Sequence, residues 1–292
     1  MMNDWIKSLI QAPILKAIVA ITLITIQAYL LNDLVVKHKF SRMLSTIPGA
    51  LFILLSVYAL EPYVLHPILI ANLFFLLSVR SLFNIYKRHN PIATLFNSGF
   101  FLMIASLIYP GYIIFILLLL LGIFSLRNLD PREVLQLLGG IFIPVFLTFV
   151  ALFYLGVSNE LTTHFFGAVG WKPWVPDEGI AHGAVQFFKP ALFLILIIVT
   201  TLMHFVVKKK KKYDVIKKIE LTYWMLFLSL PAIFIVGSVY EYKALLLVML
   251  TVPLSIVLGL IMEQKKNSIL KEFIFLILVL GFFAFQLKEY IG

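Results

Sequence analysis

The sequence predicts an all-α fold, a polytopic transmembrane helical bundle of about ten spans. The first observation is composition: 62% of the 292 residues are hydrophobic and 13% are charged, with a mean hydropathy of +1.02. Soluble domains are roughly 45–50% apolar and about 25% charged. The second observation is patterning, because apolar runs of spanning length alternate with short polar segments in which Lys and Arg cluster.

The same composition excludes several other classes of protein. A single soluble domain has no room for this much apolar surface, and a disordered chain needs low hydrophobicity. Cysteine is absent, so a disulfide scaffold is excluded as well. The net charge of +10 lies in short clusters between apolar runs rather than on a basic face, so no nucleic-acid partner is expected.

The apolar runs divide the chain into ten expected spans within one integral membrane domain, residues 1–292. Two adjacent pairs of spans are joined by tight turns, at Glu61-Pro62 and at Tyr109-Pro110-Gly111, where Pro and Gly favour a turn. The expected spans are 17–36, 44–60, 64–83, 92–109, 111–126, 134–156, 190–207, 221–238, 243–262 and 270–287.

The loop charges predict the orientation. Eighteen of the 24 Lys and Arg residues fall in alternate loops on one side, whereas the 14 acidic residues divide equally between the sides. The positive-inside rule therefore places the basic loops in the cytoplasm and both termini outside it. An amphipathic stretch at residues 5–10, with no cleavage site after it, is expected to lie in the interface rather than to act as a secretory signal.

Two segments carry a family resemblance. IQAYLLNDLVVKHKFSR (26–42) and the region 66–127, which begins HPILIANLFFLLSVRSLF, resemble an uncharacterised family of polytopic inner-membrane proteins of Gram-negative bacteria. The resemblance implies a fold and a bacterial inner-membrane location but no activity. Members of that family usually have one further span upstream of the segment that begins here at Met1. We expect either that the start codon is called late or that this member has lost that span.

The arrangement of an Arg-terminated span, a polar turn and paired apolar spans also resembles membrane glycosyltransferases that use polyprenyl-phosphate sugars. This likeness implies a catalytic carboxylate in the first outer loop, where Asp4 or Glu61 would stand in. Neither residue lies in a recognisable motif.

The long outer loop, residues 157–189, is the main candidate site, because long loops in compact folds are often functional. Asp177 and Glu178 are the candidate catalytic residues, with a carboxylate acting as general base. Substrate binding is assigned to Trp171, Trp174, His164 and His182, since tryptophan rings stack on sugars. The alternative is an interfacial aromatic belt with charges facing water. His164, His182 and Asp177 have metal-ligand chemistry but no known ligand spacing, so no metal and no cofactor are expected.

Arg80 is the remaining candidate for substrate binding. It lies one turn inside the end of the third span, so it either extends to the cytoplasmic interface or faces the bundle and binds a lipid phosphate. Lys208 to Lys212, in the polybasic loop 208–220, are expected to contact anionic lipid, and the alternative is that they serve only as a topology signal.

Polar residues and prolines within the spans have two interpretations each. Gln27, Asn72, Asn97 and Gln136 form either hydrogen bonds between helices or a substrate pathway. Pro144, Pro231 and Pro253 kink their spans, as transporters do at binding sites and as many bundles do without transport, and glycine at 139–140 permits close helix packing.

These features favour a protein that handles a lipid-linked substrate, such as a glycan, at the outer face. A transporter or flippase and a non-catalytic subunit of an envelope complex are the alternatives. Membrane lipids are expected partners in every case, and the enzyme assignment stays open.

Overall fold

The structure is a computed structural model that describes residues 13–40, 46–60, 65–86, 91–126, 130–156, 180–203, 212–237, 247–262 and residue 276. Every secondary-structure element in these residues is a helix, so the all-α class is confirmed for the described part of the chain. The expected span 270–287 lies almost entirely outside the described residues.

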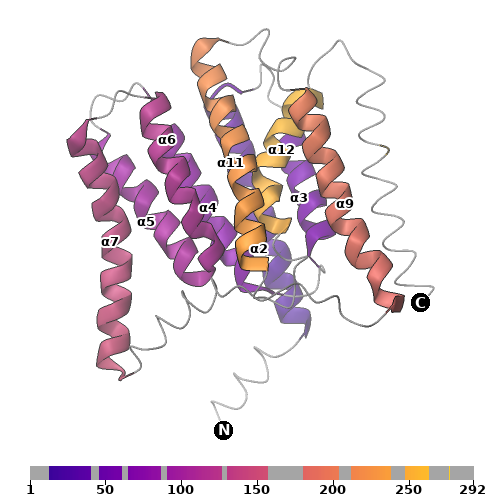
Figure 1. Ribbon diagram of the computed structural model, residues 1–292, viewed down its shortest axis with the longest axis horizontal. Helices are drawn as coiled ribbons and strands as arrows, with labels where there is room; N and C mark the ends of the chain where they lie inside the picture. Colours follow the sequence, from indigo (N-terminus) through magenta and orange to yellow (C-terminus); the bar gives the residue numbers. More distant parts are fainter. Residues whose placement is uncertain are drawn as a thin grey trace.

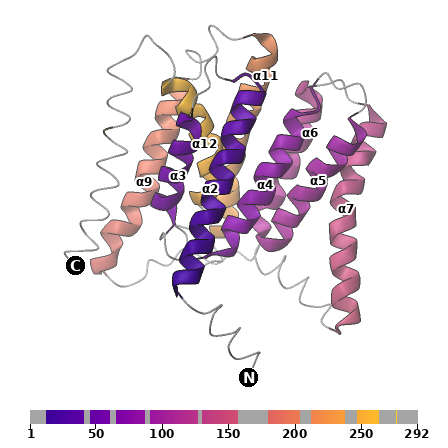
Figure 2. The ribbon, with the colours of Figure 1, turned by 180° about the vertical axis from the view of Figure 1, so that it is seen from behind.

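The helices follow the apolar runs along the chain (Figures 1 and 2). They are α2 (Pro13–Lys37), α3 (Ile47–Ala59), α4 (Pro67–Phe83), α5 (Ile92–Ile108), the 3₁₀ helix η1 (Pro110–Phe115), α6 (Ile116–Leu126), α7 (Pro131–Tyr154), α9 (Ile180–Leu202), α11 (Tyr213–Gly237) and α12 (Val248–Met262). Of the helices that start earlier than the hydropathy indicates, α9 and α11 differ most from the expected spans. Residues 180–189, expected in the outer loop, belong to α9, and residues 213–220, expected in the polybasic loop, are the first two turns of α11.

Local sequence signals account for the helix ends. The Asp130 side chain accepts a hydrogen bond from the backbone N–H of Arg132 at 3.0 Å, and Pro131 occupies the first turn of α7, where no N–H is needed. His66 caps α4 in the same way. Pro110 ends α5 and opens η1, so α5 and α6 form a hairpin at the turn that the sequence indicates.

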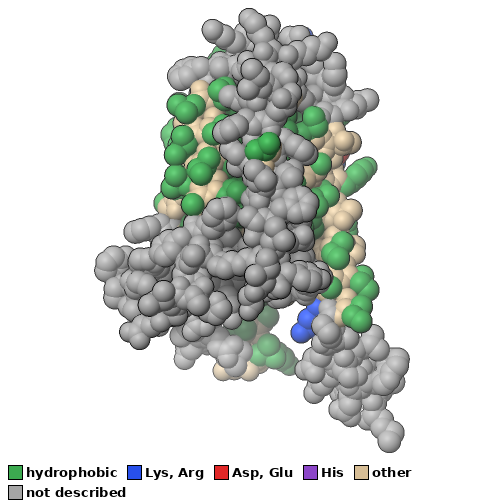
Figure 3. All heavy atoms as spheres, turned by 90° about the vertical axis from the view of Figure 1, so that its right-hand side faces the viewer, with side chains coloured by type: hydrophobic (Ala, Val, Ile, Leu, Met, Phe, Trp, Pro, Cys, Tyr) green, Lys and Arg blue, Asp and Glu red, His purple; other side chains and the backbone are tan. Residues whose placement is uncertain are grey.

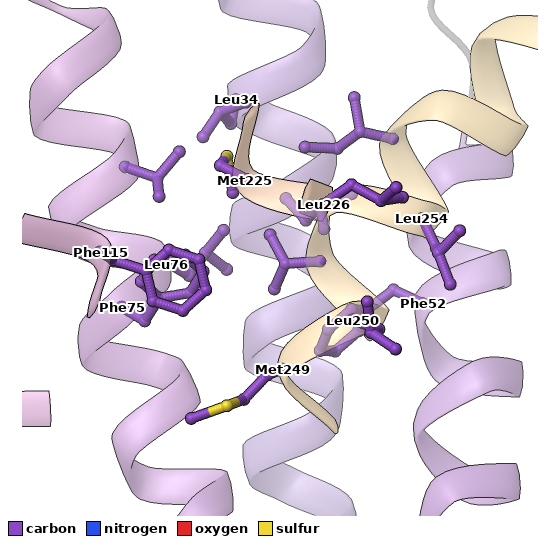
Figure 4. Close-up of a cluster of buried hydrophobic side chains, with 14 of the residues drawn as sticks. Leu34, Phe52, Phe75, Leu76, Phe115, Met225, Leu226, Met249, Leu250 and Leu254 are labelled. Carbon is purple, nitrogen blue, oxygen red and sulfur yellow. The ribbon is translucent and has the colours of Figure 1, made fainter. Parts of the chain in front are cut away.

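The core of the described bundle surrounds α12. This helix packs against α3, α11, α9, α4 and α2, and all but its last residue are buried. Figure 4 shows how α2, α3, α4, η1, α11 and α12 converge there. The labelled core residues are Leu34, Phe52, Phe75, Leu76, Phe115, Met225, Leu226, Met249, Leu250 and Leu254.

By contrast, α7 lies at one edge of the bundle and packs mainly on α5 (Figure 1). The contact depends on two glycines: a Cβ atom at Gly140 would collide with the backbone of Phe96, and one at Gly99 would meet the backbone oxygen of Leu137. A Cβ at Gly139 would meet nothing within 4 Å. The expectation that glycine at 139–140 permits close packing is therefore confirmed for Gly140, and Gly139 takes no part.

Two described helices are long and apolar enough to cross a membrane: residues 14–37 of α2 and all of α7, each 24 residues long. Several shorter apolar helices, of 10–17 residues, accompany them. Hydrophobic side chains cover much of the outer surface of the described helices, and Figure 3 shows them across the described part of the side on which α9 lies.

Candidate functional site

The charged side chains of the described helices gather at one end of the bundle. Helices α2, α4, α6, α9 and α12 end there and α3, α5, α7 and α11 begin there, at the upper end in Figure 1. Among the described charged side chains, Lys16 near the start of α2 is at the opposite end. The others lie at this end, which we call the basic end: Asp33, Lys37, Lys39, Arg80, Asp130, Arg132, Glu133, Lys212, Lys217, Lys218 and Glu220.

Arg80 faces a neighbouring helix at the basic end. Its Nη2 atom lies 2.5 Å from Oδ2 of Asp33 on α2, and both side chains are about one-third exposed, at 32% and 38%. The pair lies about one turn inside the ends of α2 and α4. Among the described residues, the guanidinium donates a hydrogen bond from Nη2 to the Asp33 carboxylate.

A second cluster lies beside this ion pair. The Nζ atom of Lys218 on α11 lies 3.1 Å from Nδ1 of His38 and 5.1 Å from the ring centre of Tyr86. Lys218 and His38 are both buried, each 7% exposed. Because an ammonium group only donates hydrogen bonds, Nδ1 of His38 accepts one here and the ring proton belongs on Nε2.

The electrostatic surroundings keep His38 neutral. Burial first, and then the positive charges of Lys218, Lys37 and Arg80, together lower the pKa of His38 from 6.5 to about 3. The buried Nε2 atom has no hydrogen-bond partner among the described residues. His38 therefore presents a neutral N–H donor in a positively charged setting.

A helix C-cap holds His38 in place. The backbone N–H of Phe40 donates to Val35 and that of Lys39 donates to Val36, which are the two hydrogen bonds of a Schellman motif. The motif needs a left-handed residue, and Lys39 supplies it with φ 55° although glycine is the usual choice. Phe40 is then buried edge-on against Phe83, and the His38 ring packs on the same phenyl group.

A neutral polar network joins α2, α4 and η1. The side-chain amide of Gln27 donates to the backbone oxygen of Leu69, Asn72 donates to Gln27, and the Tyr112 hydroxyl donates to Asn72, at 3.0–3.1 Å. These side chains are fully buried. The expected hydrogen bonds between helices are confirmed for Gln27 and Asn72, whereas Asn97 is exposed and Gln136 is half-buried.

Most of the sequence-predicted site lies outside the described residues. This holds for Trp171, Trp174, Asp177, Glu178 and His164, and for Lys208 to Lys211. His182 belongs to α9 and Lys212 is exposed just before α11. Within the described ranges, no group of three His, Asp or Glu side chains is placed to hold a metal ion.

The sequence did not indicate the His38–Lys218 contact or the Asp33–Arg80 pair. His38 and Lys218 are 180 positions apart in the sequence, and Asp33 and Arg80 are 47 positions apart. No local motif links the residues of either pair. One signal was available for the ion pair. Asp33 and Arg80 each lie a turn from the end of an expected span, and the predicted topology puts both ends on one side.

Comparison with known families confirms one part of the resemblance seen in the sequence, namely that the family is uncharacterised. The chain matches the model of a family of unknown function, DUF6427, over residues 7–291. It belongs to this family. The DUF6427 match extends well beyond residues 26–42 and 66–127, on which the resemblance rested, and it carries no activity. No curated protein and no solved structure matches the chain.

Proposed function

We propose that this DUF6427 member is a multispanning inner-membrane protein with its basic end in the cytoplasm. The surfaces of α2 and α7 support this proposal. Only 28% and 17% of their most apolar stretches are buried, whereas a core helix of a soluble protein is mostly buried. On α7, Phe142, Leu147 and Phe153 are 63%, 57% and 70% exposed. Such a surface suits contact with lipid, because proteins in water rarely expose apolar patches this large.

The charge distribution supports the orientation. The described charged side chains gather at the basic end, and the loops there contain the other lysine and arginine clusters of the sequence. Such asymmetry is typical of cytoplasmic loops. On this orientation Lys208 to Lys212 meet anionic lipid at the cytoplasmic surface, where each nearby Lys is worth about 1 kcal/mol.

At the outer face, we propose that the chain handles a lipid-linked substrate. The end of α7 at Tyr154 and the start of α9 at Ile180 both lie at the end opposite the basic one, so the segment between them joins the helices there. Asp177 and Glu178 are its acidic candidates and Trp171 and Trp174 its ring-stacking candidates. His164 and His182 complete this set, whereas Arg80 belongs to the basic end.

Packing gives more support to a non-catalytic subunit than to a transporter as the second candidate. The Gln27, Asn72 and Tyr112 side chains are buried and bonded to one another, as in a structural core. Pro144 belongs to α7, which lies at the edge of the bundle, and Pro231 belongs to α11, which packs against α12, so the two prolines lie on separate helices (Figure 1).

Single cysteines test the orientation, since the chain has none of its own. Trp174→Cys and Lys210→Cys are labelled with an impermeant maleimide in inner-membrane vesicles of known sidedness. In right-side-out vesicles the cysteine at position 174 should be labelled, and in inside-out vesicles the cysteine at position 210 should be labelled. Equal labelling of both positions in intact vesicles contradicts the proposed topology.

Charge-removing substitutions test the lipid-linked substrate. Asp177→Asn and Glu178→Gln keep the side-chain shape and are expected to abolish complementation of a deletion strain at normal membrane abundance. Trp171→Ala and Trp174→Ala are expected to weaken it less, because stacking contributes to binding and not to proton transfer. Full complementation by the double carboxylate variant at normal abundance rules out catalysis by this loop.

A further inference from the structure

Two side-chain amides at one edge of the bundle have no hydrogen-bond partner among the described residues. They belong to Asn97 on α5, which is exposed, and to Gln136 on α7, which is half-buried. By contrast, the amides of Gln27 and Asn72 are fully buried and bond to each other. Asn97 and Gln136 therefore each keep a donor and an acceptor for a group outside the described part of the chain.

The two free amides lie at nearly the same depth in the bundle. A Cβ atom at Gly140 of α7 would meet the backbone of Phe96 and Phe100 of α5, so these parts of the two helices are level with each other. At a rise of about 1.5 Å per residue, Asn97 and Gln136 are then within about one helical turn, or about 5 Å, of each other along the helix axes.

The two amides also lie on the same side of the helix pair. Helices α5 and α7 both begin at the basic end, so they run in the same direction (Figure 1). At about 100° per residue, Asn97 and Gln136 fall on one side of the plane through the two helix axes. Ala93, one turn before Asn97, and Ile143, two turns after Gln136, are exposed on this side. We call this surface, formed by Ala93, Asn97, Gln136 and Ile143, the amide face.

On the proposed topology, the amide face borders the hydrocarbon of the membrane. Helix α5 has 17 residues and none of them is charged. It is therefore about 25 Å long, less than the roughly 30 Å of the hydrocarbon core. Lipid chains offer no hydrogen bonds there, and amide side chains in membranes bond across to neighbouring helices. An exposed Asn97 thus points to a polar partner from a helix that packs on this face.

We propose that the amide face binds a second copy of this chain, with Asn97 of each copy paired to Gln136 of the other. A side-chain amide both donates and accepts, so one amide satisfies another. A two-fold axis along the membrane normal keeps every residue at its own depth and places α5 of one copy against α7 of the other. The same rotation therefore forms two amide pairs. A partner of different sequence needs polar side chains at this depth, whereas a second copy supplies them.

Energy transfer between copies tests this association. Full-length chains that contain Lys210→Cys carry either a donor or an acceptor dye, and they are mixed in phosphatidylcholine vesicles at a series of protein-to-lipid ratios. We expect saturable transfer, which gives the dissociation constant of the dimer. Transfer that only follows the density of acceptors in the membrane overturns the proposal, and it is the result expected if another membrane protein or another segment of this chain covers the amide face. The proposal rests on the membrane-spanning topology, which the labelling at positions 174 and 210 tests separately.

Substitutions at the amide face locate the contact. Asn97→Leu is expected to weaken the dimer by about fivefold or more, because it removes both amide pairs. Gln136→Leu should have the same effect, and the double variant should lose no more than either single one, since the two residues share the same pairs. Asn97→Gln retains an amide and should keep most of the affinity.

Thr201→Leu is the matched control for these variants. It replaces an exposed polar side chain near the basic end of α9, at the opposite edge of the bundle from α7 (Figure 1). The Thr201 hydroxyl already donates to the backbone oxygen of Ile197 within the same helix, so no partner from another copy is expected. The dissociation constant should stay within about twofold of that of the parent chain. Equal dissociation constants for Asn97→Leu and Thr201→Leu overturn the proposal.

Discussion

Helices α12 and α7 are both strongly apolar in sequence, yet they occupy opposite surroundings. Each also contains an internal proline, Pro253 and Pro144. Nearly every residue of α12 is buried among five other helices, whereas α7 lies at the edge and exposes most of its length. Hydropathy alone does not separate them, because lipid and protein interior accept the same side chains.

The difference lies in how each helix meets its neighbours. On α12 the contact runs around the whole circumference, so nearly every side chain fills space in the core. On α7 the buried residues form a single stripe, and the backbones of α5 and α7 approach each other closely at Gly140. If α7 faces lipid, the two helices should respond differently to truncation and to charge. Four substitutions test this comparison, in order of decreasing expected effect.

Truncation of a core leucine should have the largest effect. Leu254→Ala in α12 removes a fully buried side chain, and we expect the free energy of unfolding to fall by about 2–5 kcal/mol. Leu147→Ala in α7 is the matched control. That side chain is 57% exposed, so the surrounding lipid or detergent fills the space and the change should stay below about 0.5 kcal/mol. Denaturant titration in mixed micelles measures both, and equal losses would mean that α7 is buried against protein.

Much of this helical arrangement follows from the sequence, because a run of apolar residues bounded by polar ones sets each helix. Hydropathy does not predict the helix boundaries where a helix continues beyond its apolar run. Helix α9 begins at Ile180 and α11 at Tyr213, earlier than the apolar runs, because residues such as His182 and Lys217 are tolerated in a helix that extends out of the apolar zone. The sequence also does not predict which face of α7 is exposed, since phenylalanine and leucine occur on lipid-facing and buried faces alike.

The basic end was predictable only in part. Loop charges place Arg80 there and leave its direction open, whereas the structure pairs it with Asp33. The His38–Lys218 contact joins residues 180 positions apart, and it forms because α11 returns beside the end of α2. No spacing rule anticipates such a contact. The outer-loop candidates, including Asp177 and Trp174, lie outside the described residues and stay a prediction.

Introduction of a charge tests whether the exposed surface of α7 faces lipid. Phe146 is 51% exposed near the middle of the helix. In a membrane, Phe146→Lys places an ammonium group in hydrocarbon, at a cost of about 2.5–3.5 kcal/mol on insertion scales. We expect a marked fall in the amount of membrane-integrated protein, measured by carbonate extraction and immunoblotting. Phe146→Leu should integrate normally, and normal integration of Phe146→Lys would place this face of α7 in water.

The adjacent glycines test the narrow contact between α5 and α7. Gly140→Val adds carbon atoms where the backbone of Phe96 already lies, and overpacking of this kind costs about 1–3 kcal/mol. Gly139→Val changes the neighbouring residue identically, but its Cβ atom meets nothing within 4 Å. Cysteine pairs placed across α5 and α7 should lose their cross-linking in Gly140→Val and keep it in Gly139→Val. Equal cross-linking in the two variants would contradict the close approach at Gly140.

The smallest expected effect concerns the neutral polar network, which couples η1 to α4 and α2. Tyr112→Phe removes the hydroxyl that donates to Asn72 at 3.1 Å and keeps the ring that packs on Phe75. Hydrogen bonds between membrane helices contribute about 0.6 kcal/mol on average, because the separated helices find other partners. The free energy of unfolding should therefore fall by about that amount, well below the loss in Leu254→Ala.

Tyr29→Phe is the control for this substitution, since Tyr29 lies on α2 and is 72% exposed. It removes the same hydroxyl from the surface and should leave stability unchanged in the same titration. The two variants also separate the structural interpretation of the network from a substrate pathway. If Tyr112→Phe abolishes complementation while its stability matches that of Tyr29→Phe, the network acts on a substrate. The interior of the bundle then has a functional role in addition to packing, unlike the exposed surface of α7.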